Sequence, residues 1–237
     1  MTELKGSRSA SRLEFYARWI FIFLSLMPCV YRFYIGDWVS AAAAGLTIIL
    51  LLLPPLLEKL LKITLPNSYK YIYLVFIIAS MYLGELHSFF YRIVWWDIML
   101  HTASAMMLAY LTWLLAYVIN HDADLDKKVR PFFIALFVFC VPVALGAIWE
   151  MFEFAADKVL GVNMIKAIAP GDITRFYDYQ RGFYNSLHDM IMDTSGALLV
   201  AIGVYLHLFK KDKSKSGFSI LINQFIDANP SIFKKIV

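Results

Sequence analysis

Residues 131–155 read PFFIALFVFCVPVALGAIWEMFEFA, and this stretch decides the fold class of the chain. It carries no charge except Glu150 and Glu153, which lie close to its end. A helix needs about 20 apolar residues to cross the ~30 Å hydrocarbon core of a bilayer, so this stretch is long enough to span a membrane. The two acids then lie inside or at the edge of a hydrophobic helix, where ionisable side chains are rare.

Several other stretches have the same character. Hydrophobic residues make up 60% of the 237 residues and charged residues 17%, a balance that soluble domains do not show. The sequence therefore predicts an all-α fold, an integral membrane bundle of about six transmembrane helices. These helices are expected at residues 16–35, 38–57, 69–90, 94–119, 131–155 and 187–209.

The remaining segments divide the chain into three parts. Residues 1–14 are expected to form a polar lead-in, residues 15–210 the transmembrane domain, and residues 211–237 an amphipathic tail on the membrane surface. A long loop at residues 156–186 connects the fifth and sixth expected helices. It is rich in aromatic residues, which suit a cap on the helix ends or a segment at the level of the lipid headgroups.

The basic residues predict the orientation of the bundle. With the N-terminus inside, sixteen lysines and arginines fall on the cytoplasmic side and six on the other side. This bias predicts that the N- and C-termini are both cytoplasmic and that the loop at 156–186 is on the outer side. The net charge of +4 follows from the same asymmetry, and it gives no indication of nucleic-acid binding.

Three of the expected helices carry acidic or histidine residues three or four positions apart. These pairs are Asp97 with His101, Glu150 with Glu153, and Asp189 with Asp193. Residues at this spacing share a helix face. With a rise of ~1.5 Å per residue, each pair lies within about 5–10 Å of the outer end of its helix. We therefore predict that the six residues converge in one polar layer in the outer half of the membrane.

Facing carboxylates and imidazoles are typical of divalent-metal sites in helical bundles. The predicted metal ligands are His101, Glu150, Glu153, Asp189 and Asp193. The site would hold one or two ions: oxygen-rich ligation favours magnesium, manganese or iron, and His101 also suits zinc. Such a metal could activate water or polarise a phosphoryl oxygen, which would make the protein a metal-dependent hydrolase or transferase within the membrane.

All six residues of the polar layer are also candidate catalytic acids, bases or proton carriers, because ionisable groups in a membrane also relay protons. Simpler interpretations exist for two of them. Asp97 could simply lie at the N-terminus of its helix, where the helix dipole stabilises a negative charge. Asp189 could be the N-terminal cap of its helix. Arg181 and Arg175 in the outer loop are candidate contacts to an anionic group of a substrate, although lone loop arginines are commonly only solvated.

Three short motifs resemble a known group of proteins. The stretch WDIMLH at 96–101 resembles the Asp-x-x-x-His helix of VanZ-like and YjdF-like small membrane proteins. The stretch WEMFEF at 149–154 is similar to the aromatic-flanked Glu-x-x-Glu of the YjdF-like branch, and residues 180–197 are similar to its closing segment. The chain departs from this pattern at Asn185, where an acid is expected, and at Arg181, which separates Gln180 from Gly182.

The resemblance implies a multi-pass protein of the bacterial cytoplasmic membrane, part of the cell envelope, with the matched acids and His101 as its polar signature. VanZ-like members are associated with resistance to lipid-anchored glycopeptide antibiotics, and the YjdF-like branch is largely uncharacterised. Both departures, at Asn185 and at Arg181, argue against a metal site that relies on a ligand from this loop.

These observations favour a membrane site that binds or acts on an envelope lipid or a lipid-linked molecule. Two alternatives remain open: a proton-coupled transporter or flippase of small molecules or lipids, and a non-catalytic membrane protein whose outer loop binds a partner. The inner halves of the last three expected helices hold almost no ionisable residues, which argues mildly against a proton path.

Overall fold

A computed structural model describes residues 2–93, 95–120, 128–209 and 217–233. Within these ranges all the regular structure is helical, and no strand is present. Six of the helices are long and apolar enough to cross a membrane. The predicted all-α fold with six spanning helices is therefore confirmed. The chain divides into two units, Met1–Ile93 with Asn223–Pro230 and Val94–Ile222 with Ser231–Val237, which are described separately.

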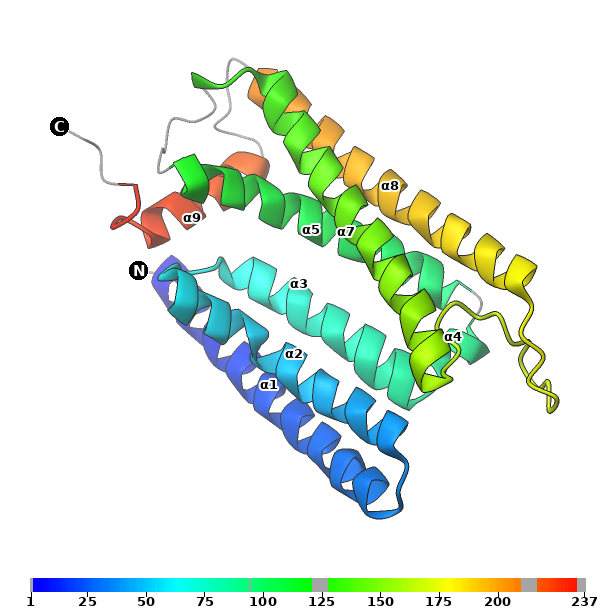
Figure 1. Ribbon diagram of the computed structural model, residues 1–237. Helices are drawn as coiled ribbons and strands as arrows, with labels where there is room; N and C mark the ends of the chain where they lie inside the picture. Colours follow the sequence, from blue (N-terminus) through cyan, green and yellow to red (C-terminus); the bar gives the residue numbers. More distant parts are fainter. Residues whose placement is uncertain (1, 94, 121–127, 210–216, 234–237) are drawn as a thin grey trace. The chain divides into compact units, whose positions relative to one another are not determined.

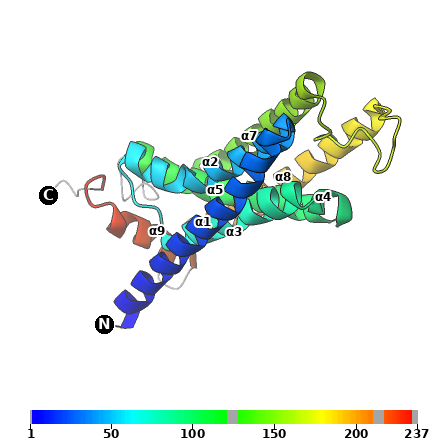
Figure 2. The same ribbon diagram turned by 90° about the horizontal axis from the view of Figure 1, so that it is seen from below.

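The first unit contains the N-terminal helices. They are α1 (Thr2–Tyr34), α2 (Trp38–Leu61), α3 (Asn67–Ile77), its π-helical continuation η1 (Ile78–Leu86) and the short α4 (Phe89–Arg92). Helices α1, α2 and α3 pack against one another (Figures 1 and 2). Their shared core is formed by Ile22, Leu51, Leu74 and Ile77. Helix α1 begins well before the predicted residue 16, so the predicted polar lead-in is helical in its backbone.

Asp37 separates the first two helices of this unit. Its carboxylate accepts a hydrogen bond from the Ser40 amide at 3.2 Å, which caps α2, and it pairs with Arg32 at 2.9 Å. These contacts, of which those from Ser40 are the larger, hold the pKa of Asp37 below its ordinary value. A capping acid at a helix N-terminus is stabilised by the exposed amides.

A segment from the end of the chain completes the first unit. The predicted amphipathic tail contains helix α9 (Gly217–Ala228), and Asn229 follows it. The Asn229 side chain accepts a hydrogen bond from the Thr64 amide at 2.6 Å and donates one to the Thr64 carbonyl at 3.0 Å. Asn229 therefore binds both peptide groups of a residue in the turn between α2 and α3.

The second unit is built on three long helices, α5 (Trp96–Asn120), α7 (Pro131–Leu160) and α8 (Tyr179–Phe209). Each contacts the other two, and Figure 1 shows them alongside one another. Glycines permit the close approach. A side chain at Gly196 of α8 would collide with the Thr102 carbonyl of α5, and one at Gly146 of α7 would collide with the Asp193 carboxylate. Small residues at such contacts are typical of membrane helices.

The connection between α7 and α8 is shorter than the predicted loop at 156–186. Helix α7 continues to Leu160 and ends at Gly161, whose φ of +66° is a left-handed conformation that glycine adopts readily. Helix α8 begins at Tyr179, because the Asp178 carboxylate accepts hydrogen bonds from the amides of Gln180 and Arg181. The additional helical turns are polar, so hydropathy alone did not predict them.

Candidate functional site

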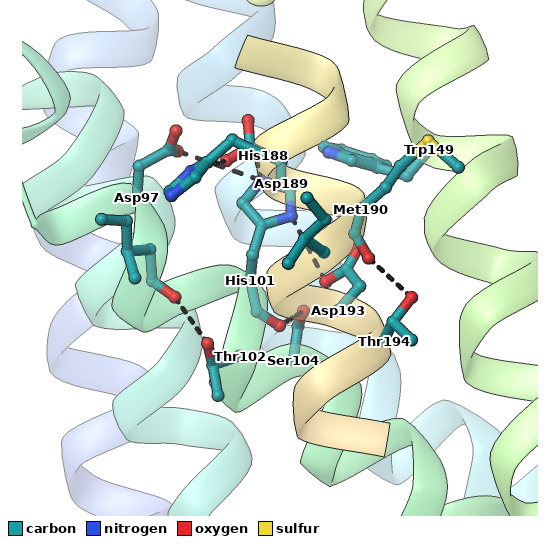
Figure 3. Close-up of polar contacts among 12 residues, drawn as sticks. Asp97, His101, Thr102, Ser104, Trp149, His188, Asp189, Met190, Asp193 and Thr194 are labelled. Atoms are coloured by element: carbon teal, nitrogen blue, oxygen red, sulfur yellow. Dashed lines mark hydrogen bonds and ion pairs between the residues drawn. The ribbon is translucent and has the colours of Figure 1, made fainter. Parts of the chain in front are cut away.

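His101 is the centre of a polar cluster between α5 and α8 (Figure 3). Its Nε2 atom lies 3.9 Å from Asp97 Oδ1 and 3.9 Å from Asp189 Oδ2. Asp97 is one turn earlier on α5, so helical spacing alone brings it to the same face. Asp189 comes from α8 and is only 1% exposed. The predicted convergence of these three residues is therefore present in the structure.

The other nitrogen of His101 faces a different acid. Nδ1 lies 3.3 Å from Asp193 Oδ1, one turn further along α8 than Asp189. Metal-binding histidines commonly pair their second nitrogen with a carboxylate, which fixes the orientation and tautomer of the ring. Asp193 was predicted as a ligand, but the structure places it where it would orient His101 and leave Nε2 facing Asp97 and Asp189.

The geometry around Nε2 is close to that of a metal site. Asp97, His101 and Asp189 each offer one ligand atom, and these three atoms lie within 4.8 Å of one another. Ligand atoms about 2.1 Å from a tetrahedral ion are separated by about 3.4 Å, so a small contraction would complete the site. Asp97, which the sequence suggested only as an acid or base, is thus better placed as a ligand than Glu150, Glu153 or Asp193.

Glu150 and Glu153 of α7 lie beside this trio and are both buried. Glu153 accepts a hydrogen bond from the Trp149 indole at 2.8 Å. Glu150 is close enough to His101, Asp97 and Asp193 for its charge to interact with them, and Ser186 is nearby. Neither Glu150 oxygen has a hydrogen-bond partner among the residues that the structure describes. Burial of an ionised carboxylate that has no hydrogen-bond partner raises the free energy of the folded protein. A proton or a cation bound to the carboxylate removes this penalty.

Lys166 supplies a positive charge to the cluster. Its ammonium forms an ion pair with Asp97 Oδ2, although the two residues are 69 positions apart. Five carboxylates therefore lie in or beside the site, on Asp97, Glu150, Glu153, Asp189 and Asp193. One lysine does not balance so many acids if they are all ionised, so the site favours further cations or protons.

The loop that presents Lys166 is held by specific hydrogen bonds. Lys166 has a left-handed backbone with φ +53°, unusual for a residue other than glycine. Its amide donates to the Asn163 carbonyl at 3.3 Å, and its own carbonyl accepts from Arg181 Nε at 2.9 Å. The Asn163 side chain also bonds both peptide groups of Ile168. The loop is thus built to fix the backbone from which Lys166 extends.

Comparison with known proteins is consistent with this architecture. Residues 16–210 match the model of a family described as predicted membrane protein (DUF2238). The chain belongs to this family. A relative in Thermotoga maritima, described as an uncharacterized protein, is 25% identical over 152 residues, which cover 64% of this chain and 69% of the relative. No solved structure matches the chain.

The loop of this DUF2238 protein is anchored to α7 by Asp157. This buried carboxylate accepts hydrogen bonds from the amides of Met164, at 2.6 Å, and Ile165, at 3.3 Å. Asp157 follows Glu153 by four positions and so continues the acidic face of α7. Asp157 falls within the loop expected at residues 156–186, although its spacing of four from Glu153 indicates the same helix face.

Replacing Asp157 with alanine should release the loop without unfolding the helices. The half-buried amide of Met164 and the buried amide of Ile165 would lose their acceptor, and a buried unsatisfied group destabilises the local structure by about 1–3 kcal/mol. We expect cleavage within residues 161–178 by a nonspecific protease to become at least roughly tenfold faster, by the same free-energy argument. Asp172→Ala is the matched control, because the Asp172 carboxylate accepts local hydrogen bonds from Thr174 and Phe176 within the loop and does not anchor the loop to α7. Equal cleavage of both variants would contradict the anchoring role.

The two arginines predicted to contact an anion have other contacts in the structure. Arg175 donates to the Gly161 carbonyl at 2.9 Å, and Arg181 donates to the Lys166 carbonyl. Both are exposed and hold the loop. Within the loop, hydrogen bonds from Thr174 hold the pKa of Asp172 below its ordinary value.

Sequence reasoning did not identify Lys166 or Asn185 as members of the site. The Asn185 amide donates to Asp189 Oδ2, and it lies one turn before Asp189 on α8. This asparagine stands where the family resemblance led us to expect an acid, and it supports a ligand instead of adding one. Lys166 left no local signal, because its partner Asp97 is on a distant helix.

Proposed function

We propose that this membrane protein binds a divalent cation on Asp97, His101 and Asp189, and uses it to bind or act on an envelope lipid or a lipid-linked molecule. The observation that carries the proposal is the set of three ligand atoms within 4.8 Å of one another. The carboxylate of Asp193 on the opposite nitrogen of His101 supports it, as this pairing prepares an imidazole for metal binding.

The residues beside the cation would divide the chemical work. A bound divalent ion would polarise a phosphoryl or carbonyl oxygen, or activate water. Asp193 would orient His101, and the Glu150 carboxylate would hold or transfer a proton at an oxygen that has no described hydrogen-bond partner. Glu153, whose carboxylate accepts a hydrogen bond from the Trp149 indole, would keep the α7 side of the site polar. These roles correspond to a hydrolase or transferase in the outer half of the membrane.

The surface next to the site supports a lipid as the ligand. The loop that carries Lys166 exposes apolar side chains, with Ile173 96% exposed and Phe176 also exposed. Val159 and Leu160 at the end of α7 are similarly uncovered. Apolar side chains of this kind suit contact with acyl chains at a membrane interface. The resemblance to VanZ-like proteins, and the bacterial relative in Thermotoga maritima, favour the cytoplasmic membrane of a bacterium as the location.

Metal analysis of the detergent-purified protein tests the proposal. After removal of loosely bound metal, we expect titration with Mn²⁺ or Zn²⁺ to show about one ion per chain, because three protein ligands define a single site. Asp189→Asn should weaken binding strongly, and Asp172→Asn, in the exposed loop, should leave it unchanged. Failure of the wild-type protein to bind either ion would overturn the proposal.

A proton-coupled transporter is the second candidate, and His207 is the observation that favours it. His207 is buried in α8 against the Trp113 ring of α5, at a ring separation of 5.8 Å. It adds an ionisable group to α8 far along the helix from Asp193. A carrier would bind no divalent ion and would need His207 as well as His101. Metal-free protein, together with loss of cellular function in His207→Ala, would favour the carrier.

A further inference from the structure

Asp97 is shared between two cationic positions. Its Oδ2 pairs with the Lys166 ammonium, and its Oδ1 faces His101 Nε2 at 3.9 Å, where the proposed cation would bind. The side chains of Lys166 and Asp97 are 20% and 16% exposed, so the ion pair is largely withdrawn from solvent. Charges that are only a few ångströms apart interact strongly in such surroundings, because water screens them poorly.

The backbone of Lys166 cannot follow its side chain easily. Hydrogen bonds from Arg181 and to Asn163 hold both peptide groups of Lys166, and Asp157 fixes the two residues before it. If the ammonium leaves Asp97, the movement must therefore come from the side chain first. The loop thus keeps one positive charge tethered at the edge of the proposed cation site.

We infer that Lys166 is a tethered cation that competes with the divalent ion for Asp97, so that cation binding releases the lysine. This inference rests on the proposed cation site. A divalent ion on Asp97 Oδ1 withdraws charge from the carboxylate and repels the neighbouring ammonium. Coupling of this kind is reciprocal: removal of the lysine strengthens cation binding, and cation binding frees the lysine.

A static role for Lys166 would differ in one measurable respect. A lysine that only balances the acids stays on Asp97 whether or not the ion is bound, so its accessibility does not change. A competing lysine becomes accessible when the ion arrives. The reactivity of the Lys166 amine therefore separates the two roles, and the affinity of the site measures the strength of the coupling.

The first measurement is Mn²⁺ affinity by calorimetry in detergent. We expect Lys166→Met to bind Mn²⁺ roughly tenfold more tightly than the wild-type protein, within the usual range of coupling between neighbouring sites. Lys166→Arg keeps the charge and should bind like the wild type. Lys158→Met is the matched control, because Lys158 donates to Tyr179 at 3.0 Å and packs on aromatic rings at the end of α7. Lys166→Gln repeats the test if the methionine variant does not fold.

The second measurement uses the wild-type protein alone. An amine-labelling reagent is applied with and without Mn²⁺, and the labelling of Lys166 is compared with that of Lys158 by mass spectrometry. We expect Mn²⁺ to accelerate labelling of Lys166 several-fold and to leave Lys158 unchanged.

The outcomes separate the inference from the site itself. The wild-type protein could bind Mn²⁺ with the same affinity as Lys166→Met, and Mn²⁺ could leave the labelling of Lys166 unchanged. In that case the inferred competition is wrong and the cation site stands. If only Lys166→Met binds Mn²⁺, the proposed function of the wild-type protein is wrong, although the lysine and the cation do exclude each other at Asp97. If neither the wild type nor Lys166→Met binds, the cation site is wrong and the inference fails with it.

Discussion

Replacing His101 with alanine is expected to abolish high-affinity cation binding. The Nε2 atom of His101 is the ligand atom that faces both Asp97 and Asp189, at 3.9 Å from each. Its loss leaves two carboxylates without the imidazole between them and removes the partner of Asp193. Loss of a residue that only orients a metal ligand lowers metal affinity by roughly 10- to 100-fold. Loss of the ligand itself should therefore lower the affinity for Mn²⁺ at least about 100-fold.

The matched control for this variant is His87→Ala. His87 is an exposed histidine in the first unit, at the end of η1, and it lies against Tyr82. It should leave Mn²⁺ binding unchanged in equilibrium dialysis. His101→Ala protein that elutes as the wild type in gel filtration and still binds Mn²⁺ with wild-type affinity would contradict the assignment of His101 as a ligand.

The second large effect is expected from a single added methyl group. Gly196→Ala places a Cβ atom against the Thr102 carbonyl of α5, and a backbone carbonyl cannot move aside as a flexible side chain can. Overpacking of this kind destabilises proteins by about 1–3 kcal/mol. It should also displace α8 from α5, and so move Asp189 and Asp193 away from His101. We therefore expect a lower melting temperature in detergent together with weaker Mn²⁺ binding.

Gly45→Ala provides the control for this effect. A Cβ atom at Gly45 would meet only the Cys29 sulfur, at 3.9 Å, which is an ordinary contact. Alanine is favoured over glycine within helices by about 1 kcal/mol, so this variant should melt at the same or a higher temperature. A Gly196→Ala variant that behaves like Gly45→Ala would mean that α5 and α8 do not need their close contact.

The sequence predicted the helices well because the membrane leaves few alternatives. An apolar stretch such as residues 131–155 must satisfy its backbone hydrogen bonds internally in lipid, and a helix does this. The spacing of Asp97 with His101, and of Asp189 with Asp193, likewise placed each pair on one helix face. Polar helix ends were harder to predict from the sequence. The turns from Tyr179 to residue 186 lack an apolar pattern, so they were predicted to belong to a loop.

The sequence by itself determined the six spanning helices and the acidic and histidine faces they carry, because both depend on periodicity along a single helix. Only the tertiary structure decided which acid faces which nitrogen of His101, and that Lys166 reaches Asp97 across 69 residues. These contacts depend on how the helices rotate and slide against one another. That arrangement is set by close contacts such as Gly196 on Thr102 and by the loop fold around Asp157. Local sequence patterns do not encode such distances.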